Sequence, residues 1–268
     1  MSVGTDGGAM LIATVVDYVA GTRDGWEWAV DDVRRLALGE IDAGASLRSI
    51  PEVGRLVAGM HLALAGRGRD QASRADTDSW RAEAVADLRG SGIGTSDADL
   101  VAQEFARIDD CRSPVVIDVH GDLHIGQILR QARTEALYVI DFDGNPMQSP
   151  AQRRARQPVA RDVAGMLASL DHVARVVLHR TEGLDGEQQG RVIEWIAAAQ
   201  RSFLAAYVTV LAEKDEDALL DQRLLRPFQL QQECREFIYA ARYLPHWRYV
   251  PEAALHALLH QQSEPQIE

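Results

Sequence analysis

Side chains that can move protons or bind a metal gather in two short segments of this 268-residue sequence. The first is His120-Gly-Asp-Leu-His-Ile-Gly-Gln127, and the second is Ile140-Asp-Phe-Asp143. A phosphoryl-transfer site needs one carboxylate to accept the hydroxyl proton, and an amide and a second carboxylate to hold Mg²⁺. The spacing therefore predicts Asp122 as the catalytic base. The predicted metal ligands are Gln127, Asp141 and Asp143.

Each segment follows an apolar run that predicts a strand, residues 114–119 in one case and 136–140 in the other. A further strand is expected over 11–19, ended by Gly21, and a polar loop over 66–79. Apolar residues at helical spacing predict helices elsewhere. The expected helices are 26–38, 50–64, 97–108, 161–178, 187–211, 224–243 and 252–260, with Pro245 and Pro251 separating the last two. We therefore expect an α+β fold, predominantly α, in which a small central sheet carries the catalytic loop.

The two histidines of the first segment have different expected roles. His120 is expected to hold the loop by hydrogen bonds, whereas His124 is equally consistent with loop support and with substrate contact. A purely structural role for the whole constellation is disfavoured. It would require five polar residues, bounded by apolar strands, only to satisfy backbone groups.

Composition excludes several classes of partner. The formal charge of −12 and the pI near 5.1 argue against nucleic acid and anionic membranes, and the short cluster Arg153-Arg-Ala-Arg156 is expected in a solvated loop. Cys111 and Cys234 lack metal-ligand spacing, so we expect reduced thiols. The longest apolar stretches are expected to fall well short of the roughly 20 residues that span a bilayer, and the N-terminus lacks the pattern of a secretory signal, so we expect a cytoplasmic protein.

The helix expected over 224–243 divides into an apolar and a polar face. Its polar side carries Gln229, Gln232, Glu233, Glu236 and Tyr243. That face is either ordinary solvated surface or the wall of a sugar pocket, in which carboxylates and amides bind hydroxyls and Tyr239 or Trp247 stacks on the ring. Asp171 and His172 are likewise either pocket residues or part of a polar helix surface.

Four segments together resemble the C-terminal lobe of the aminoglycoside-phosphotransferase-like kinases, a protein-kinase-like fold. They are His120 to Gln127, Ile140-Asp-Phe-Asp-Gly144, Arg161-Asp-Val-Ala-Gly-Met-Leu167 and Asp17-Tyr-Val-Ala-Gly-Thr-Arg-Asp-Gly-Trp-Glu-Trp28. The similarity is greatest to the actinobacterial glucosamine kinase and maltokinase group, because Gln127 replaces the commoner Asn. It implies ATP and Mg²⁺ as cofactors. It also implies a hinge under the nucleotide base, formed by Asp17, Tyr18 and Val19.

The resemblance further implies a domain arrangement, with residues 1–24 as the end of an N-lobe and its hinge and residues 25–268 as the helical C-terminal lobe. Such kinases also have a phosphate-covering loop and a strand lysine. The single lysine here, Lys214, lies in an acidic stretch far downstream and is not expected to fill that role. We therefore expect a fragment or truncated form, with the possibility of an N-lobe supplied by another chain.

Residues 232–251 look more like the glucosamine kinases than the maltokinases, because Glu233 stands where maltokinases have a small apolar residue. An added carboxylate suits an ammonium group on the sugar. The expected reaction is glucosamine to glucosamine 6-phosphate, with His124, Asp171, His172, Glu233, Glu236, Tyr239 and Trp247 as candidate substrate contacts. The alternatives are a maltokinase making maltose 1-phosphate, an aminoglycoside acceptor, or a non-catalytic C-lobe that binds a sugar or a partner.

Overall fold

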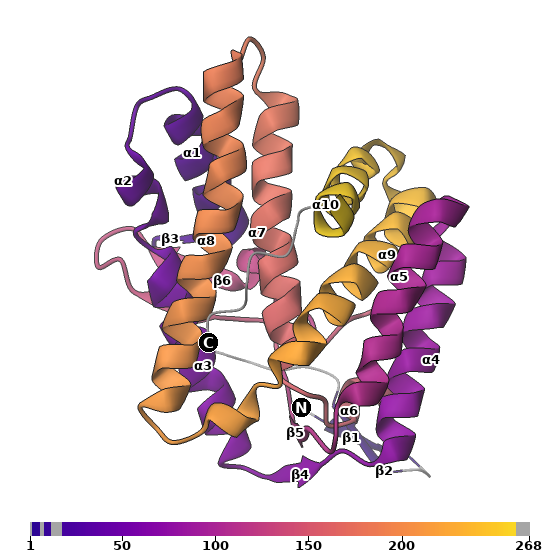
Figure 1. Ribbon diagram of the computed structural model, residues 1–268. Helices are drawn as coiled ribbons and strands as arrows, with labels where there is room; N and C mark the ends of the chain where they lie inside the picture. Colours follow the sequence, from indigo (N-terminus) through magenta and orange to yellow (C-terminus); the bar gives the residue numbers. More distant parts are fainter. Residues whose placement is uncertain (1, 6–7, 12–17, 261–268) are drawn as a thin grey trace.

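The computed structural model describes residues 2–5, 8–11 and 18–260, and within them the chain is mostly helical, as expected (Figure 1). The helices are α1 (Gly25–Ala37), α2 (Ala43–Leu47), α3 (Ile50–Ala65), α4 (Arg74–Ser91), α5 (Thr95–Ala106), α6 (Pro150–Arg154), α7 (Ala160–Arg180), α8 (Gly186–Ala212), α9 (Leu225–Tyr243) and α10 (Tyr249–His260). The strands are β1 (Ser2–Thr5), β2 (Gly8–Leu11), β3 (Thr22–Asp24), β4 (Arg69–Gln71), β5 (Val115–Ile117), β6 (Ile128–Gln131) and β7 (Leu137–Val139).

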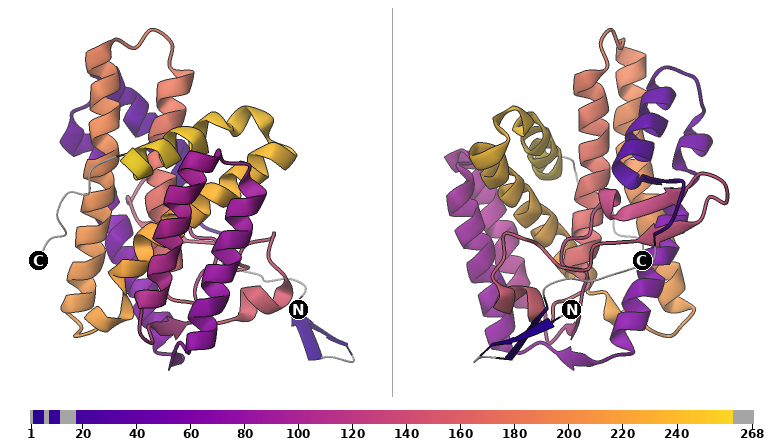
Figure 2. Two further views of the ribbon diagram at one scale, coloured as in Figure 1. Left: turned by 45° about the vertical axis from the view of Figure 1, so that its right-hand side comes forward. Right: turned by 180° about the vertical axis from the view of Figure 1, so that it is seen from behind.

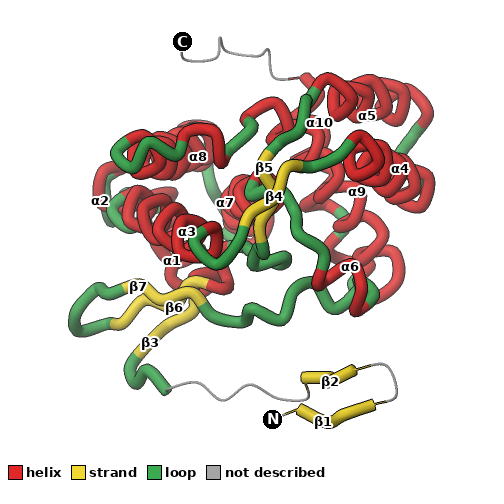
Figure 3. The backbone as a smooth tube through the Cα atoms, turned by 90° about the horizontal axis from the view of Figure 1, so that it is seen from below, coloured by secondary structure: helices red, strands yellow, loops and turns green. Residues whose placement is uncertain are grey.

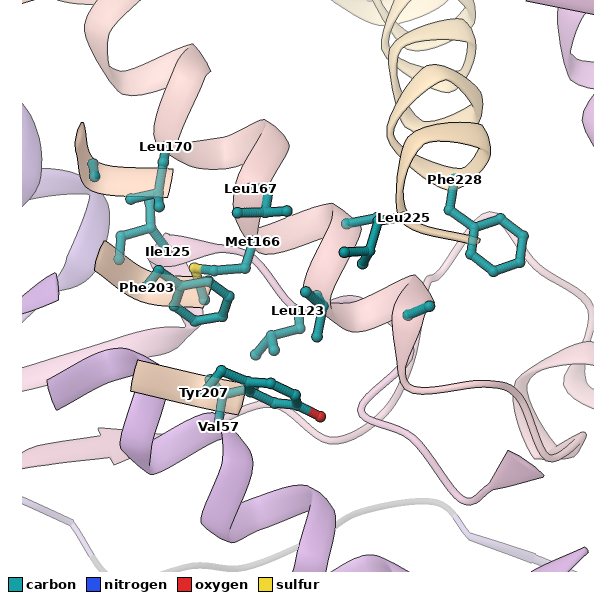
Figure 4. Close-up of a cluster of buried hydrophobic side chains, with 14 of the residues drawn as sticks. Val57, Leu123, Ile125, Met166, Leu167, Leu170, Phe203, Tyr207, Leu225 and Phe228 are labelled. Carbon is teal, nitrogen blue, oxygen red and sulfur yellow. The ribbon is translucent and has the colours of Figure 1, made fainter. Parts of the chain in front are cut away.

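Helix α7 is the centre of the fold. It packs against α1 and α8 on one side and against α9 and α10 on the other, while α3 runs along α8 and α4 along α9 (Figures 1 and 2). Figure 4 shows how Met166 and Leu170 of α7 meet Phe203 of α8 and Ile125 of the catalytic loop. Because α7 is buried on nearly all sides, its polar residues are forced into the interior along with its apolar ones.

The expected small sheet is divided into separate antiparallel pieces, seen from below in Figure 3. Strand β5, which leads into the catalytic loop, pairs with β4. Strands β6 and β7 form a hairpin that β3 extends to three strands, and β7 leads to Asp141. Strands β1 and β2 pair only with each other in the described part of the chain. The loop after β5 and the loop after β7 therefore leave different sheets and meet near the start of α7.

Three local differences from the sequence-based expectations have physical reasons. The segment 66–79 contains β4 and the start of α4, a helix that sequence periodicity missed because its buried face carries only Trp80, Ala84 and Leu88 among the larger or apolar side chains. A capping box between Ser73 and Asp76 fixes where α4 begins. Pro251 lies in the first turn of α10, where a missing N–H costs no helical hydrogen bond, so it does not separate the helices.

The strand expected over 11–19 is not formed in the part that the structure describes. Leu11 ends β2, residues 12–17 lie outside the described residues, and Tyr18 and Val19 have no regular secondary structure. The other expected helices and both motif-bearing strands are confirmed, with boundaries that differ by up to three residues.

Helix α8 is long and apolar enough to cross a membrane by length and composition, with a mean hydropathy of 1.2 over its most apolar window. The expectation that no apolar stretch reaches this length is therefore wrong for α8. One such helix in the described residues is weak support for a membrane span, because buried side chains of α8 such as Trp195 and Phe203 belong to the protein core.

Candidate active site

Asp162, near the start of α7, fixes the catalytic loop through its backbone. Its two carboxylate oxygens accept hydrogen bonds from the backbone N–H groups of His120 (2.8 Å) and Gly121 (2.9 Å). His61 of α3 contributes a third contact, with 3.1 Å between its Nε2 and Oδ2 of Asp162. Burial alone would raise the pKa of Asp162, but the hydrogen bond and charge of His61 lower it below its usual value. An ionised carboxylate therefore holds the loop in place.

The His61 and His120 rings are each oriented by contacts at both ring nitrogens. Nδ1 of His61 lies 2.8 Å from the Tyr207 hydroxyl, which is drawn in Figure 4, and its Nε2 faces Asp162. Nδ1 of His120 accepts from the Asp122 backbone N–H (3.3 Å), which leaves Nε2 to donate to the Ile140 carbonyl (2.8 Å). His120 thus joins the loop 120–127 (the catalytic loop) to the loop 140–145 that carries the predicted ligands Asp141 and Asp143 (the metal-ligand loop), the supporting role expected for it.

Asp122 is half-buried at the junction of these loops. Burial raises its pKa, against the opposing influence of His124 and His120, so the carboxylate is a stronger base than one in water. The side-chain amide of Asn145 donates to its Oδ1 at 3.2 Å. Asp122 therefore remains the candidate base, a half-buried carboxylate held by one side-chain amide.

His124 caps the turn that follows Asp122, because its Nδ1 accepts from the backbone N–H of Gly126 at 3.1 Å. Burial lowers the pKa of His124, which favours the neutral ring. Loop support by His124 is therefore present in the structure.

Two of the three predicted metal ligands lie together. The Gln127 amide nitrogen donates to Oδ2 of Asp141 at 3.3 Å, and Asp141 has a backbone φ of +65°, a strained value for a non-glycine residue. Asp143 is exposed nearby, and its backbone carbonyl accepts a 3.4 Å hydrogen bond from Arg153. Among the described residues, no three His, Cys, Asp or Glu side chains form a metal cluster. The oxygen donors still fit Mg²⁺, which binds few protein ligands and relies on water and phosphates for the rest.

Aromatic and acidic side chains from three elements line the adjacent surface. The Trp247 indole donates to Oε2 of Glu236 at 3.1 Å, and the Gln232 amide contacts Oε1 of the same carboxylate at 3.2 Å. Trp26 of α1 faces Trp247 with 5.7 Å between ring centroids. Glu236 is close enough to influence the pKa values of both Asp122 and His124. The structure therefore brings an oriented carboxylate and two indoles beside the candidate base.

Gly25 allows α1 to start against the catalytic loop. A Cβ at this position would stand 1.8 Å from the Ile125 carbonyl oxygen, which no side chain could tolerate. The close approach places Trp26 at the edge of the catalytic loop, where its Cβ lies 3.9 Å from the position that a Cβ on Gly126 would occupy.

Glu233 is expected on a polar face, either solvated or lining a sugar pocket, and the structure buries it instead. Its carboxylate is fully buried, and both oxygens lie 3.0 Å from Nε2 of His172 on α7. Burial raises the pKa of Glu233 to about 7, although His172 opposes the shift. Burial alone would lower the pKa of His172, but Glu233 raises it to about 9. Glu233 and His172 therefore form an internal pair behind Trp247, whose ring contacts His172 edge-on.

The remaining predicted residues contact groups other than Asp122, are largely exposed, or lie outside the described residues. Asp171 is buried in an ion pair with Arg175, with oxygen–nitrogen distances of 2.8 and 3.1 Å. Tyr239 is 44% exposed and contacts Tyr243. Tyr18 is 89% exposed, the Val19 carbonyl accepts from the Thr22 hydroxyl, and Asp17 lies outside the described residues.

Three residues near the site were given no role from the sequence. Asp162 and Trp26 lie inside quoted motifs, so their neighbourhood was a usable signal, but their partners are distant in sequence. Asn145 follows Asp143 by two residues, and only the packing of the two loops reveals its contact with Asp122.

A concavity of about 810 Å³ lies elsewhere, between the α1–α2 connection and α8, and is lined by Leu36, Ile41, Leu47 and Trp195 among others. It includes none of the candidate catalytic residues. The site is therefore defined by the convergence of side chains around Asp122.

The chain is similar to known proteins along most of its length. A profile of the phosphotransferase enzyme family matches residues 13–151. A glucosamine kinase of Streptacidiphilus jiangxiensis is 50% identical over 259 residues, which cover 93% of this chain and 58% of that protein. A glucosamine kinase of Mycolicibacterium smegmatis is 38% identical over 262 residues, covering 93% of this chain and 63% of that protein.

Solved structures show the same similarity. A glucosamine kinase in complex with glucosamine, ADP and inorganic phosphate superimposes with a TM-score of 0.85 at 49% identity, covering 90% of this chain and 62% of that one. A second crystal form of a glucosamine kinase gives a TM-score of 0.88 at 47% identity, covering 96% and 64%. The chain thus spans roughly three fifths of the relatives it matches.

Proposed function

Because the chain belongs to the phosphotransferase enzyme family, we propose that it transfers a phosphoryl group from ATP to a sugar hydroxyl, with glucosamine as the acceptor. The observation that carries the proposal is the position of Asp122, a half-buried carboxylate between the Gln127–Asp141 pair and the Glu236–Trp247 surface. Similarity to two glucosamine kinases supports the same acceptor.

The proposed reaction starts with the acceptor hydroxyl beside Asp122. Its proton passes to the carboxylate as the oxygen attacks the γ-phosphorus, and the bond to the bridging oxygen breaks so that ADP leaves with the electron pair. Asp162 and His120 keep the base in line by fixing the loop backbone. The raised pKa of Asp122 makes proton acceptance more favourable than it would be for an exposed aspartate.

Gln127 and Asp141 are proposed to hold Mg²⁺, with Asp143 as a third oxygen donor. Mg²⁺, when bound, would neutralise charge on the nucleotide phosphates. The contribution of this chain is to keep the Asp141 carboxylate against Gln127 and to fix the preceding carbonyl with His120. Tyr18 and Val19, with Asp17, remain proposed contacts of the nucleotide base.

Glu236 is proposed as the acidic residue that recognises the glucosamine ammonium group. Trp247 and Gln232 already orient its carboxylate, and a charge-assisted hydrogen bond is stronger than a neutral one. Trp26, Trp247 and His124 are proposed to contact the sugar ring and its hydroxyls. Glu233 and His172 are proposed to act from behind this surface by joining α9 to α7, and the Asp171–Arg175 pair by supporting α7 itself.

A cytoplasmic location is proposed from the two cysteines. Cys111 and Cys234 are buried and free, and burial raises the pKa of each thiol to about 12, so both are poorly reactive.

The test is sugar-dependent release of ADP in the presence of Mg²⁺, with glucosamine, glucose and maltose compared at equal concentrations. It is run on this chain and on a chimera that adds the remainder of the Streptacidiphilus jiangxiensis relative. The proposal predicts preference for glucosamine in at least one of the two proteins. Preference for maltose would replace the acceptor, and no sugar-dependent release from either protein would contradict phosphoryl transfer.

A further inference from the structure

The catalytic loop and the metal-ligand loop touch through two glycines. Gly121 has a φ of +82° and Gly144 a φ of +71°, conformations that side chains rarely adopt. A Cβ on Gly121 would stand 3.3 Å from the Cα of Gly144, so the backbones pack closely here. This contact brings the next residue, Asn145, against Asp122, 23 positions earlier in the sequence.

The orientation of the Asn145 amide follows from its second hydrogen bond. Its Oδ1 accepts from the backbone N–H of Met147 at 2.8 Å, which requires an oxygen at that position. The nitrogen Nδ2 therefore points to Oδ1 of Asp122, at 3.2 Å, and acts as the donor. The side chain of Asn145 thus presents its N–H group, and not its oxygen, to the candidate base.

Arg153 of α6 supports the same turn from outside. Its guanidinium donates to the Asp143 carbonyl at 3.4 Å, and its aliphatic carbons lie 3.4 to 3.6 Å from where a Cβ on Gly144 would stand. The turn is therefore held at both ends, by Arg153 on one side and by Asp122 on the other.

We propose that Asn145 is a positioning residue for the base: it holds one oxygen of Asp122 and leaves the other directed to the acceptor hydroxyl. Among the described side chains, Asn145 is the one hydrogen-bonded to this carboxylate. The backbone N–H of Asp122 is meanwhile bound to His120, so the main chain and the side chain of the base are both fixed. Without Asn145, the carboxylate could rotate about its terminal torsion and lose its alignment.

The inference deepens the proposed function and rests on it for its kinetic consequence. Removing a hydrogen bond to a charged group should lower kcat about 10- to 100-fold in Asn145→Ala. The KM values for sugar and ATP should stay within about threefold, because the lost contact acts on alignment rather than on binding. Asn145→Asp keeps the shape but presents no N–H to Asp122, so its kcat should fall at least as far.

A matched control is Met147→Ala, which lies in the same turn, removes a side chain that is 56% exposed, and keeps the backbone N–H that orients Asn145. Its kcat should stay near that of the unmodified protein. A kcat for Asn145→Asp within about twofold of the unmodified protein would overturn the proposal. So would a loss confined to KM in Asn145→Ala.

A spectroscopic test separates this contact from the activity itself. Asn145 is the only asparagine in the chain, so selective ¹⁵N-asparagine labelling gives a single side-chain NH₂ group to follow by NMR. Asp122→Ala should change the chemical shifts of both NH₂ protons of Asn145. Asp99→Ala, on the exposed surface of α5, should leave these chemical shifts unchanged. Unmoved resonances in Asp122→Ala would overturn the contact, whether or not the protein releases ADP.

Discussion

Asp162→Asn should cost both stability and activity, because it changes the group that fixes the catalytic loop. The carboxylate is 2% exposed and receives hydrogen bonds from the His120 and Gly121 backbone N–H groups and from His61. An amide nitrogen in place of either oxygen would face an N–H donor. The neutral amide would also lack the negative charge that strengthens the remaining hydrogen bonds. With about 1.5–3 kcal/mol for each hydrogen bond to a charged group, loss of the one bond at Oδ1 or of the two at Oδ2 implies about 1.5–6 kcal/mol.

The assay is urea unfolding of the variant and the unmodified chain, followed by kcat at a temperature where both are folded. Asp42→Asn is the matched control, since Asp42 is an exposed N-cap and asparagine caps a helix equally well. The control should change the free energy of unfolding by less than about 0.5 kcal/mol. A change below about 1 kcal/mol in Asp162→Asn, with kcat preserved, would refute the role given to this carboxylate.

Three further predictions concern the acceptor surface, the buried pair and the metal ligands. Glu236→Gln should raise the KM for glucosamine about tenfold or more and leave that for glucose nearly unchanged, measured by ADP release; equal effects on both sugars would contradict ammonium recognition. His172 has a pKa raised to about 9, so the stability it contributes is complete below pH 6.5 and is lost as pH rises through 9, about 3 kcal/mol in all. Unfolding of the double variant His172→Gln/Glu233→Gln, which removes both members of the pair, should therefore depend less on pH between 6.5 and 9 than that of the unmodified chain, and identical slopes would contradict the pairing. Gln127→Ala should raise the Mg²⁺ concentration for half-maximal activity at least about tenfold, and an unchanged requirement would remove Gln127 from the metal site.

The two motifs could be recognised from the sequence because each is local. Asp122, Gln127 and Asp141 lie within 20 residues, and the apolar runs before them predict strands wherever their partners lie. Helices with a strong apolar stripe, such as α3 and α8, were predictable for the same reason.

The burial of Glu233 could not be predicted from α9 alone. That helix packs against α7, α4 and α10, so a polar residue on its second face is covered by other helices. Whether such a residue is solvated or paired depends on His172, 61 positions away, and no local pattern records that partner. The same limit applies to Asn145, whose role depends on the contact between two loops.

The most direct test of the account compares Asp122→Asn with the unmodified protein, in whichever form releases ADP with glucosamine. Loss of the base should reduce kcat by about 10²–10⁴-fold. Glucosamine should still raise the melting temperature of the variant, because the surface around Glu236 and Trp247 is untouched. A kcat within a few fold of the unmodified protein would contradict Asp122 as the base and with it the proposed mechanism.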